Sequence, residues 1–339
     1  MPSARQYPVR APEWRLAYAG ENITAKIIGA VTEITYTDLY AGVGNIEVKL
    51  EDKDKLWQGS RFPTQGDLLE LVIGYAGEKK LDCGQGHPFQ VDELELTGPP
   101  DVFTIRALPA WVTKPLRTPT SFAYENQTLL QVAGVVAAKH GMTVKGVPND
   151  INVSFERVTQ NRETDLGFLR RLANENDYDF SIHGTLISFH SRTFQHAKAP
   201  VLNIDRTQVE KFSFKSRAFQ IYDSATVSYQ SSETGELITG SATTTVVPST
   251  LVDKLNIVRR AENASDATQK ANAALRMQNM IFATAELTMP GNILIVAANN
   301  ITISGFGKYS AKYYIMQARH KLSRETGYTT EIELQQVPN

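Results

Sequence analysis

The sequence predicts a β-rich α+β protein in which two β domains, each a barrel or a sandwich, flank a small α+β module. Three observations predict this class. Short strand-like segments with turn residues between them fill the first third, helical and hairpin patterns occupy the middle, and strand-like segments then return. The 339 residues correspond to two or three domains. We place the first β domain at 1–112, the central α+β module at 113–200, and the second β domain, which includes one helix, at 201–339.

Strand composition dominates the first region from Trp14 onward. Its segments are rich in β-branched residues or alternate apolar and polar residues, and glycine-containing turns separate them. The expected strands are Asn22–Ile28, Val31–Tyr36, Ile46–Leu50, Leu68–Ile73, Phe89–Leu96 and Val102–Ala107. Many short strands separated by turns indicate a sandwich or a barrel.

The middle region begins with a linker that contains Pro115 and Pro119, since proline lacks a backbone donor and favours extended geometry. A first helix is expected after a cap at Asn126 or Thr128, and Gly141 ends it.

A second, broadly buried helix is expected from Glu163 or Thr164 to about Asn176. The segments 179–182 and 186–189 then predict a β-hairpin. Together with the first helix, these elements form the predicted α+β module.

Strands return after residue 200. The expected segments are 208–215, 221–229, 236–247, 293–296, 301–304, 313–320 and 329–334. One helix, from Ser265 to Phe282, interrupts them. We expect it to pack on the second β domain through Ala271, Ala274 and Leu275, because small residues allow close backbone approach.

A weak internal repeat links the two β regions. Three strands follow one another in the same order in each region, and the first strand of each set ends at a glycine followed by an aromatic residue. The two sets are 68–73, 89–96 and 102–106, and 300–304, 314–322 and 329–334. We expect them to be equivalent parts of two barrels. A different strand order, or pairing of these runs into one common sheet, would refute a duplication.

The charge balance argues against a nucleic-acid partner. Lys and Arg total 35 against 36 for Asp and Glu, and no dense basic run occurs. The only cysteine is Cys83, so no internal disulfide can form. The start of the chain has no apolar core of a signal peptide, and no uncharged stretch fits a membrane span. We therefore expect a soluble chain made in a cytoplasm, with no membrane partner.

Motifs for catalysis or for cofactor binding are not found. The pairs Gly42–Gly44, Gly84–Gly86 and Gly305–Gly307 lack the third glycine of a dinucleotide fingerprint and do not open a predicted helix. Cys83 and His87 supply only two potential metal ligands, and a turn cysteine is the better interpretation. We expect no catalytic residues, no cofactor and no metal.

Two further groups of titratable residues deserve weighing against simpler explanations. His183, His190 and His196 lie close in sequence, but strand and hairpin positions explain them better than a zinc site. An acidic stretch suggests glycoside hydrolysis, which uses two carboxylates. Its members, Glu163, Asp165, Glu175, Asp177 and Asp179, mostly fall on the predicted helix surface or at its ends, so solvated charges are the stronger interpretation.

A collinear set of segments carries a family resemblance along nearly the whole chain. The set comprises 89–93, 98–101, 116–117, 128–129, 137–141, 160–165, 168–173, 290–291, 305–307, 313–315, 320–323 and 327–330. It resembles the phage late control protein D family, the baseplate hub proteins of contractile tails, whose relatives serve type VI secretion spikes and phage-tail-like bacteriocins.

The resemblance implies two tube-type β-barrel domains per chain and a homotrimer that joins a sixfold tail tube to a threefold central spike. The chain has no room for a fused spike, so we expect a separate spike protein. The other implied partners are the tail tube or a tube-initiator protein, the tape measure protein and baseplate wedge proteins. The implied place is the virion tail baseplate, assembled in the bacterial cytoplasm. As an axial contact with a neighbouring ring we expect the loop 37–45, with Thr37, Tyr40, Gly42, Gly44 and Asn45.

Two other functions compete with the structural hub. A cell-wall hydrolase is one, because tail tips often carry such enzymes, but it requires an acid and a base on one concave face. A peptidoglycan-binding protein is the other, because the central module could resemble a carbohydrate-binding helix-and-hairpin fold. Binding to purified cell wall separates this second alternative from the other two.

Overall fold

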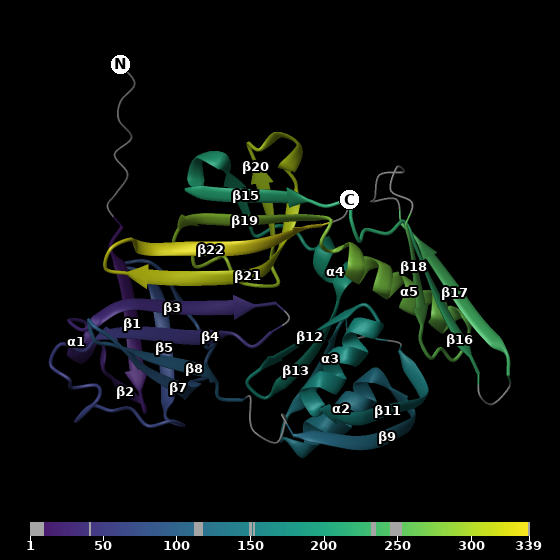
Figure 1. Cartoon of the computed structure of the whole chain (residues 1–339), viewed down its shortest axis with the longest axis horizontal. Helices are drawn as coiled ribbons and strands as arrows, with labels where there is room; N and C mark the ends of the chain where they lie inside the picture. Colours follow the sequence, from purple (N-terminus) through teal and green to yellow (C-terminus); the bar gives the residue numbers. More distant parts are fainter. Residues whose placement is uncertain are drawn as a thin grey trace.

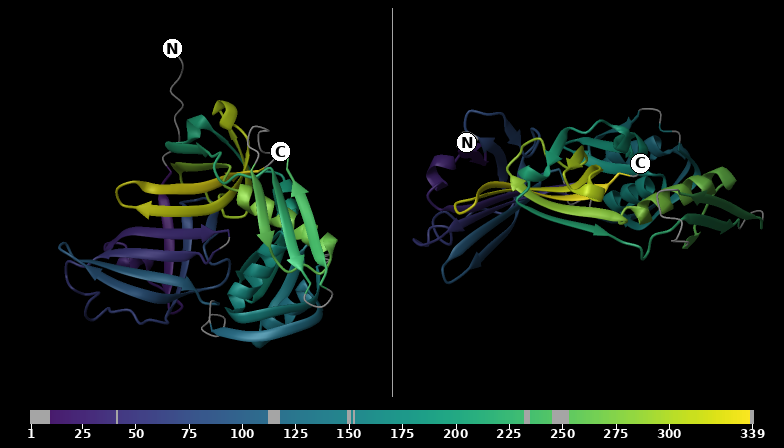
Figure 2. Two further views of the ribbon diagram at one scale, coloured as in Figure 1. Left: turned by 45° about the vertical axis from the view of Figure 1, so that its right-hand side comes forward. Right: turned by 90° about the horizontal axis from the view of Figure 1, so that it is seen from above.

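A computed structural model of the chain describes residues 10–40, 42–111, 118–148, 151, 153–231, 235–244 and 253–337 (Figures 1 and 2). The elements of the first region are β1 (Pro12–Tyr18), β2 (Glu21–Asn22), α1 (Thr24–Ile27), β3 (Val31–Leu39), β4 (Asn45–Glu51), β5 (Leu68–Tyr75), β6 (Lys80–Asp82), β7 (Phe89–Thr97) and β8 (Val102–Pro109).

The middle region combines helices with two small sheets. Its elements are β9 (Pro119–Thr128), α2 (Leu129–Lys139), β10 (Thr143–Val147), β11 (Ser154–Thr164), α3 (Asp165–Glu175), β12 (Tyr178–His183), β13 (Leu186–Ser191) and α4 (Arg192–Ala197). Thr128 caps α2 and Thr164 caps α3 through their side-chain oxygens, as two of the predicted caps require.

The last region is again mostly strand. Its elements are β14 (Leu202–Asp205), η2 (Arg206–Gln208), β15 (Lys211–Ser216), β16 (Ser224–Gln230), β17 (Leu237–Thr243), β18 (Lys254–Val258), α5 (Ala264–Asn279), β19 (Ala283–Pro290), β20 (Asn300–Ser304), η3 (Gly307–Tyr309), β21 (Lys312–Ser323) and β22 (Gly327–Gln336). The mostly β composition that the sequence predicts is therefore confirmed. In the described part of the chain, no helix is long and apolar enough to cross a membrane.

One long sheet joins the first and last regions. Its strands run in the order β15-β19-β22-β21-β3-β4-β8-β7-β5-β1-β2, with β20 and β14 added beside β21 and β6 beside β5. Figure 1 shows the yellow hairpin β21–β22 lying against the purple strand β3. The middle region lies beside this sheet, next to α5.

The two ends of this sheet repeat the same arrangement. Six strands of the first region lie in the order β1-β5-β7-β8-β4-β3, and six strands of the last region lie in the order β14-β20-β21-β22-β19-β15. Matching these strands one to one also preserves their order along the chain. One pair differs, because β1 is antiparallel to β5 whereas β14 is parallel to β20.

The register of the strands repeats as well. In the first set, Phe89, Gln90 and Val91 of β7 pair with β8, and the pairing then shifts before Glu93. In the second set, Tyr313, Tyr314 and Ile315 of β21 pair with β22, and the pairing shifts before Gln317. Phe89 also pairs with β5 in the way that Tyr313 pairs with β20. A shared β-bulge at one position of one strand is a specific feature, since bulges re-aim the chain locally.

The expectation of two separate closed barrels is not confirmed. Strand β3 of the first set pairs with β21 of the second set, so both sets belong to one common sheet, and in the described residues no closed barrel is found. The separation into two barrels is therefore not confirmed. The common sheet meets one of the two conditions stated above against a duplication, while the other is not met, because the predicted strand order is present in both sets. Sequence patterns could not reveal this junction because each strand pattern specifies a face and not a neighbour.

The hydrophobic core is divided among several clusters, and one of them crosses between the two ends of the chain. The first-region cluster contains Leu322 and Tyr328 from the hairpin β21–β22 in addition to its own residues, which include Ile34 and Phe89. The middle region has its own cluster around Phe168. The C-terminal hairpin thus completes the core of the first region.

Helix α5 packs within the last region, as predicted, but on a small sheet that is separate from the long one. It covers the separate three-stranded sheet β17-β16-β18, where Ala271 and Leu275 join a cluster with Ala225 and Val227. Ala274 is only partly buried. The apolar stripe was thus located correctly at two positions, but its partner is this small sheet and not the long one.

Two expected strands are also absent from their predicted places. Residues 24–27 form the short helix α1, in which Ile27 is buried, although their composition is typical of a strand. Residues 293–296 form turns and irregular structure, where Ile295 is buried. In both places, tertiary burial of one isoleucine outweighs a strand propensity that is only a weak preference.

Candidate functional site

The short helix α4 joins the middle region to the long sheet. Asn300 donates from Nδ2 to the carbonyl oxygens of Gln195 (2.7 Å) and Lys198 (3.0 Å). Lys312 donates from Nζ to the carbonyl oxygens of His196 (2.5 Å) and Lys198 (2.6 Å). Carbonyl groups at the end of a helix need such partners. Strands β20 and β21 thereby hold the end of α4 in place.

The first residue of α4 carries a buried charge. The Arg192 side chain is 5% exposed, and its Nε lies 2.7 Å from Oδ1 of Asp179, which is 7% exposed. A second guanidinium nitrogen donates to Oδ1 of Asn174 (2.6 Å). Asp177 lies 4.0 Å from Arg192 and also pairs with Arg276 of α5. Two aspartates and two arginines therefore link β12, α4 and α5.

Burial controls the protonation of this network. It raises the pKa of Asp179 to about 6, and Arg192 partly opposes that rise. Burial also raises the pKa of Asp177 against the pull of Arg276 and Arg192. His196, whose ring lies 4.9 Å from that of Tyr314, has its pKa lowered to about 4 by burial and by nearby cations. His196 is therefore neutral at pH 7.

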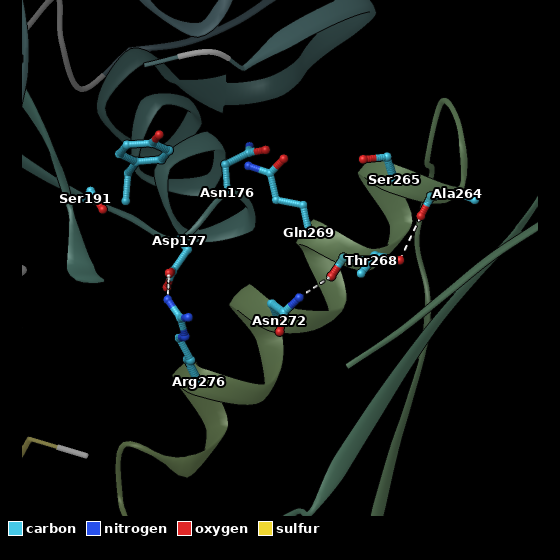
Figure 3. Close-up of a pocket in the computed structure, with 10 residues that line it drawn as sticks. Asn176, Asp177, Ser191, Ala264, Ser265, Thr268, Gln269, Asn272 and Arg276 are labelled. Carbon is cyan, nitrogen blue, oxygen red and sulfur yellow. Dashed lines mark hydrogen bonds and ion pairs between the residues drawn. The ribbon is translucent and has the colours of Figure 1, made fainter. Parts of the chain in front are cut away.

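A polar cleft opens beside this network, between the middle region and α5 (Figure 3). Its volume is about 700 Å³. The lining residues are Asn176, Asp177, Tyr178, Ser191, Ala264, Ser265, Thr268, Gln269, Asn272 and Arg276. Figure 3 shows the Asp177–Arg276 pair at one end and the amides of Asn176 and Gln269 near one another. Amide and hydroxyl groups suit hydrogen bonding with a polar ligand, and the charged pair is already neutralised.

The carboxylates that suggested glycoside hydrolysis are held in ion pairs. Glu163 lies 3.1 Å from Arg171, and Glu175 lies 3.5 Å from the same side chain. Asp165 lies 2.8 Å from Nε2 of His140 and accepts from Gln160. Their interpretation as solvated surface charges was wrong for Asp165 and Asp179, because both are buried.

The cysteine and histidine candidates lie in structural positions. Cys83 is in a turn, as predicted, and it is buried, so burial raises the pKa of its thiol. The His87 ring packs edge-on against Trp111. His190 is in β13 and His196 in α4, while His183 ends β12. Among the described residues, no group of three or more His, Cys, Asp or Glu side chains could hold a metal ion.

The predicted contact loop lies at the end of the β3–β4 hairpin. Thr37 pairs with Asn45 across this hairpin, and a Cβ on Gly44 would lie 2.5 Å from the Thr37 carbonyl oxygen. Gly42 is exposed. Tyr40 is buried, with its ring 5.0 Å from that of Tyr314. The loop therefore exposes Gly42 and leaves Gly44 and Asn45 partly exposed, while Thr37 and Tyr40 are buried.

No periodic sequence pattern indicates the α4 connection. Arg192, Asn300 and Lys312 are far apart in the chain, and a six-residue helix is too short for a periodic pattern. An arginine directly after a strand that ends in Ser191 could have suggested a helix start, because serine is a preferred cap.

Comparison with known proteins gives this geometry a context. Two curated relatives, from Escherichia phage P2 and Escherichia phage 186, are 26% and 24% identical over 208 and 209 residues, and each is described as a probable baseplate hub protein. The resemblance to phage baseplate hub proteins is confirmed. Each match covers 60% of this chain and 52% of the hub protein, so the chain spans about half the length of the curated relatives it matches. No family model matches.

Solved structures of phage tail and type VI secretion proteins share the fold of this chain. The 43 kDa tail protein of prophage MuSo2 from Shewanella oneidensis has a TM-score of 0.72 at 16% identity and covers 96% of this chain and 98% of its own. A tail protein from Neisseria meningitidis has a TM-score of 0.72 at 14% identity, covering 96% and 97%. A component of the E. coli type VI secretion system has a TM-score of 0.54 at 12% identity, covering 91% and 74%.

Buried His320 lies at the junction between the two strand sets and gives a prediction about pH. Its Nε2 donates to the Ile295 carbonyl oxygen (2.8 Å), its Nδ1 accepts from the Tyr328 hydroxyl (2.8 Å), and its ring stacks on Tyr36. Burial lowers its pKa to about 4. The unfolded chain, with an ordinary histidine pKa, then binds the proton more tightly, so stability is present above about pH 6.5 and is lost as the pH falls toward 4.

Lowering the pH from 7 to 4.5 should therefore remove about 2–3 kcal/mol through this residue. Urea unfolding of the wild type and of His320→Gln at both pH values measures the effect. The variant should be less stable at pH 7 but should lose less on acidification. If wild type and variant lose equal amounts of unfolding free energy on acidification, protonation of His320 does not destabilise the junction between the two strand sets.

Proposed function

We propose that this chain is the baseplate hub of a contractile phage tail and acts as a trimeric symmetry adaptor between a sixfold tail tube and a threefold central spike. The sequence similarity to two hub proteins and the shared fold of phage tail proteins support the hub role. The adaptor role, the trimer and the partners are our extension to this chain.

The repeated six-strand order is the observation that carries the adaptor role. A chain with two equivalent strand sets presents two similar surfaces along one ring. Three chains then present six such surfaces, which suits a sixfold partner on one side and a threefold partner on the other. Head-to-tail contacts that close on themselves produce a ring of this kind.

The proposed division is a first β domain over 1–112, a central module over 113–200 and a second β domain over 201–339. The proposed partners are a separate spike protein, the tail tube or a tube-initiator protein, baseplate wedge proteins and the tape measure protein. The near-neutral charge suits a channel through which a tape measure and a genome pass without sticking. We also propose the tip of the β3–β4 hairpin, at Gly42 and Asn45, as an axial contact.

Sedimentation and electron microscopy of the purified chain test this function. Trimers are expected, alone or on addition of the cognate spike or tube protein, and particles with the tube protein should show the chain between tube and spike. A chain that stays monomeric with both partners present, or that forms a ring with another number of subunits, would contradict the adaptor role.

The polar cleft supports a second candidate function, peptidoglycan binding. Its amides and hydroxyls could hold a glycan, as a peptidoglycan-binding tail-tip protein requires. Ion pairing of Glu163, Asp177 and Asp179 disfavours cell-wall hydrolysis, because an acid and a base must be free to exchange protons. Co-sedimentation with purified peptidoglycan, together with a zymogram, would reveal binding or cleavage.

A further inference from the structure

Several strand edges of the long sheet have no partner strand in the part of the chain that the structure describes, among them the outer edges of β2, β6 and β14. Two others correspond, through the repeat, to the two sides of the β3–β21 junction. One is the outer edge of β15, which pairs only with β19. The other is the second half of β7, residues 93–97, which pairs with β8 on one side, whereas β5 reaches only Phe89 and Gln90 on the other. Open strand edges recruit other strands unless they are covered.

The junction inside the chain shows what such edges bind. Strand β3 pairs antiparallel with the second half of β21, from Gln317 opposite Leu39 to Ser323 opposite Glu33. Its core-facing residues include His320, which stacks on Tyr36. On the outer face, Lys321 pairs with Glu33 at 2.6 Å. The junction thus has an apolar face and a charged face.

The repeat makes the two open edges equivalent to the two sides of that junction. Strand β15 corresponds to β3, since Phe214 pairs with β19 as Tyr36 pairs with β4. The open part of β7 corresponds to the part of β21 that binds β3, because it follows the same bulge. Each chain therefore has one open edge equivalent to β3 (the edge of β15) and one open edge equivalent to the second half of β21 (residues 93–97 of β7).

The register of the internal junction predicts which residues would meet. Transferring it places Glu93 opposite Arg217, Glu95 opposite Lys215 and Leu96 opposite Phe214. Of the five pairs that residues 93–97 would make, two have opposite charges and one is apolar, and cross-strand pairs of these kinds stabilise a sheet. The other two place Leu94 opposite Ser216 and Thr97 opposite Ser213. Nothing in the transfer itself imposes this match.

In the transferred pairing, the apolar side chains of both strands face the core and the charged side chains face the outer side. Leu94, on the same face of β7 as Leu96, packs against the first core cluster, and Phe214 packs against the core cluster of the last region. Glu93 and Glu95 point to the opposite face, where both contact Arg106. Leu96 is 46% exposed and Phe212, next along β15, is 48% exposed. Pairing would cover apolar surface that the single chain leaves in water.

We propose that the β15 edge of one copy adds antiparallel to residues 93–97 of β7 in the next copy, with Glu95 opposite Lys215, and so repeats the internal β3–β21 junction between chains. The partner is a second copy of this chain, held by a head-to-tail contact. The inference deepens the proposed function and rests on it for the closure of the copies into a ring.

Disulfide trapping tests the contact and its register in the full-length chain. Glu95→Cys chains are mixed with Lys215→Cys chains and treated with a mild oxidant, and cross-linked dimers are counted on a denaturing gel. Because native Cys83 is buried, it does not compete. The internal pair Thr37→Cys with Arg319→Cys calibrates the geometry, since Thr37 and Arg319 occupy the corresponding positions within one chain.

We expect the mixture to cross-link at least about tenfold faster than Glu95→Cys mixed with Ser213→Cys, which shifts the pairing by two residues. The double variant Glu95→Cys with Lys215→Cys should give covalent rings. Equal rates for the two registers, the absence of cross-links, or a chain that stays monomeric at every concentration would overturn the proposal.

Charge reversal gives an independent arm. Glu93→Lys with Glu95→Lys should weaken self-association about tenfold, and adding Lys215→Glu with Arg217→Glu to the same chain should restore it, because every contact of the ring is then again between opposite charges. Absence of restoration would overturn the proposed pairing. If trimers form with the spike and tube proteins but do not cross-link, the hub function stands and the β7–β15 contact is wrong. If cross-linked rings form with another number of subunits, the β7–β15 contact is correct and the trimeric adaptor role is wrong.

Discussion

Replacing Arg192 with methionine should lower the free energy of unfolding by about 3–5 kcal/mol, because the change leaves the buried carboxylate of Asp179 without its cation. Asp179, 2.7 Å from the guanidinium, and Asn174 both lose their partner. Burial already raises the pKa of Asp179, and the variant raises it further. Protonation then relieves the cost, so the difference from wild type should shrink as the pH falls from 7 toward 5.

Urea unfolding at pH 7 and at pH 5 measures this loss. Arg319→Met is the matched control, because its pair with Glu331 spans 3.4 Å between side chains that are 44% and 42% exposed. Exposed pairs of this kind contribute at most about 1 kcal/mol. A similar loss in both variants would show that the buried Arg192 network does not stabilise the middle region.

Gly240→Ala should destabilise the chain by about 3 kcal/mol or more, because strand β17 lies directly against helix α5. An added Cβ would lie 2.2 Å from the Thr268 nitrogen and 2.4 Å from the Ala267 carbonyl carbon. Both are backbone atoms, so no side-chain rotation relieves the clash, and the helix must move away from the sheet. We expect earlier urea unfolding and faster proteolysis within α5.

Gly134→Ala serves as the control for that change. Gly134 lies within α2, and its added Cβ would meet no atom within 4 Å. Alanine is the better helix former by about 1 kcal/mol, so this variant should be slightly more stable than wild type. Unchanged stability of Gly240→Ala would mean that α5 and β17 are not in close contact.

The sequence predicted elements well where a local pattern determines them. The alternation in β7 and the caps at Thr128 and Thr164 gave the correct element and, to within a residue or two, its correct start. The equivalence of strands 68–106 and 300–334 was also visible, because both sets repeat the same order. Strand pairing between distant segments was not visible, since the β3–β21 junction depends on neighbours that no local pattern specifies.

The candidate site shows the same limit. The acidic residues around α3 were noticed, but their burial was missed, because the cations that allow it come from elsewhere. Asp179 is balanced by Arg192 and Asp177 by Arg276, which lies on α5. From sequence alone, a carboxylate next to a helix is predicted to lie on the surface, because the cation that allows its burial is not visible. The contact loop 37–45 was found as a hairpin connection, whereas the inward direction of Tyr40 depends on Tyr314.

The sharing of one core between the two ends of the chain has a consequence for synthesis. Leu322 and Tyr328 complete the core that begins with Leu16, so the first region cannot finish folding until nearly the whole chain has left the ribosome. Until then, the edge of β3 that pairs with β21 stays open, and such long-range strand pairing is slow and prone to aggregation. The chain must therefore reach its final topology after translation, with its earliest strands among the last to be closed.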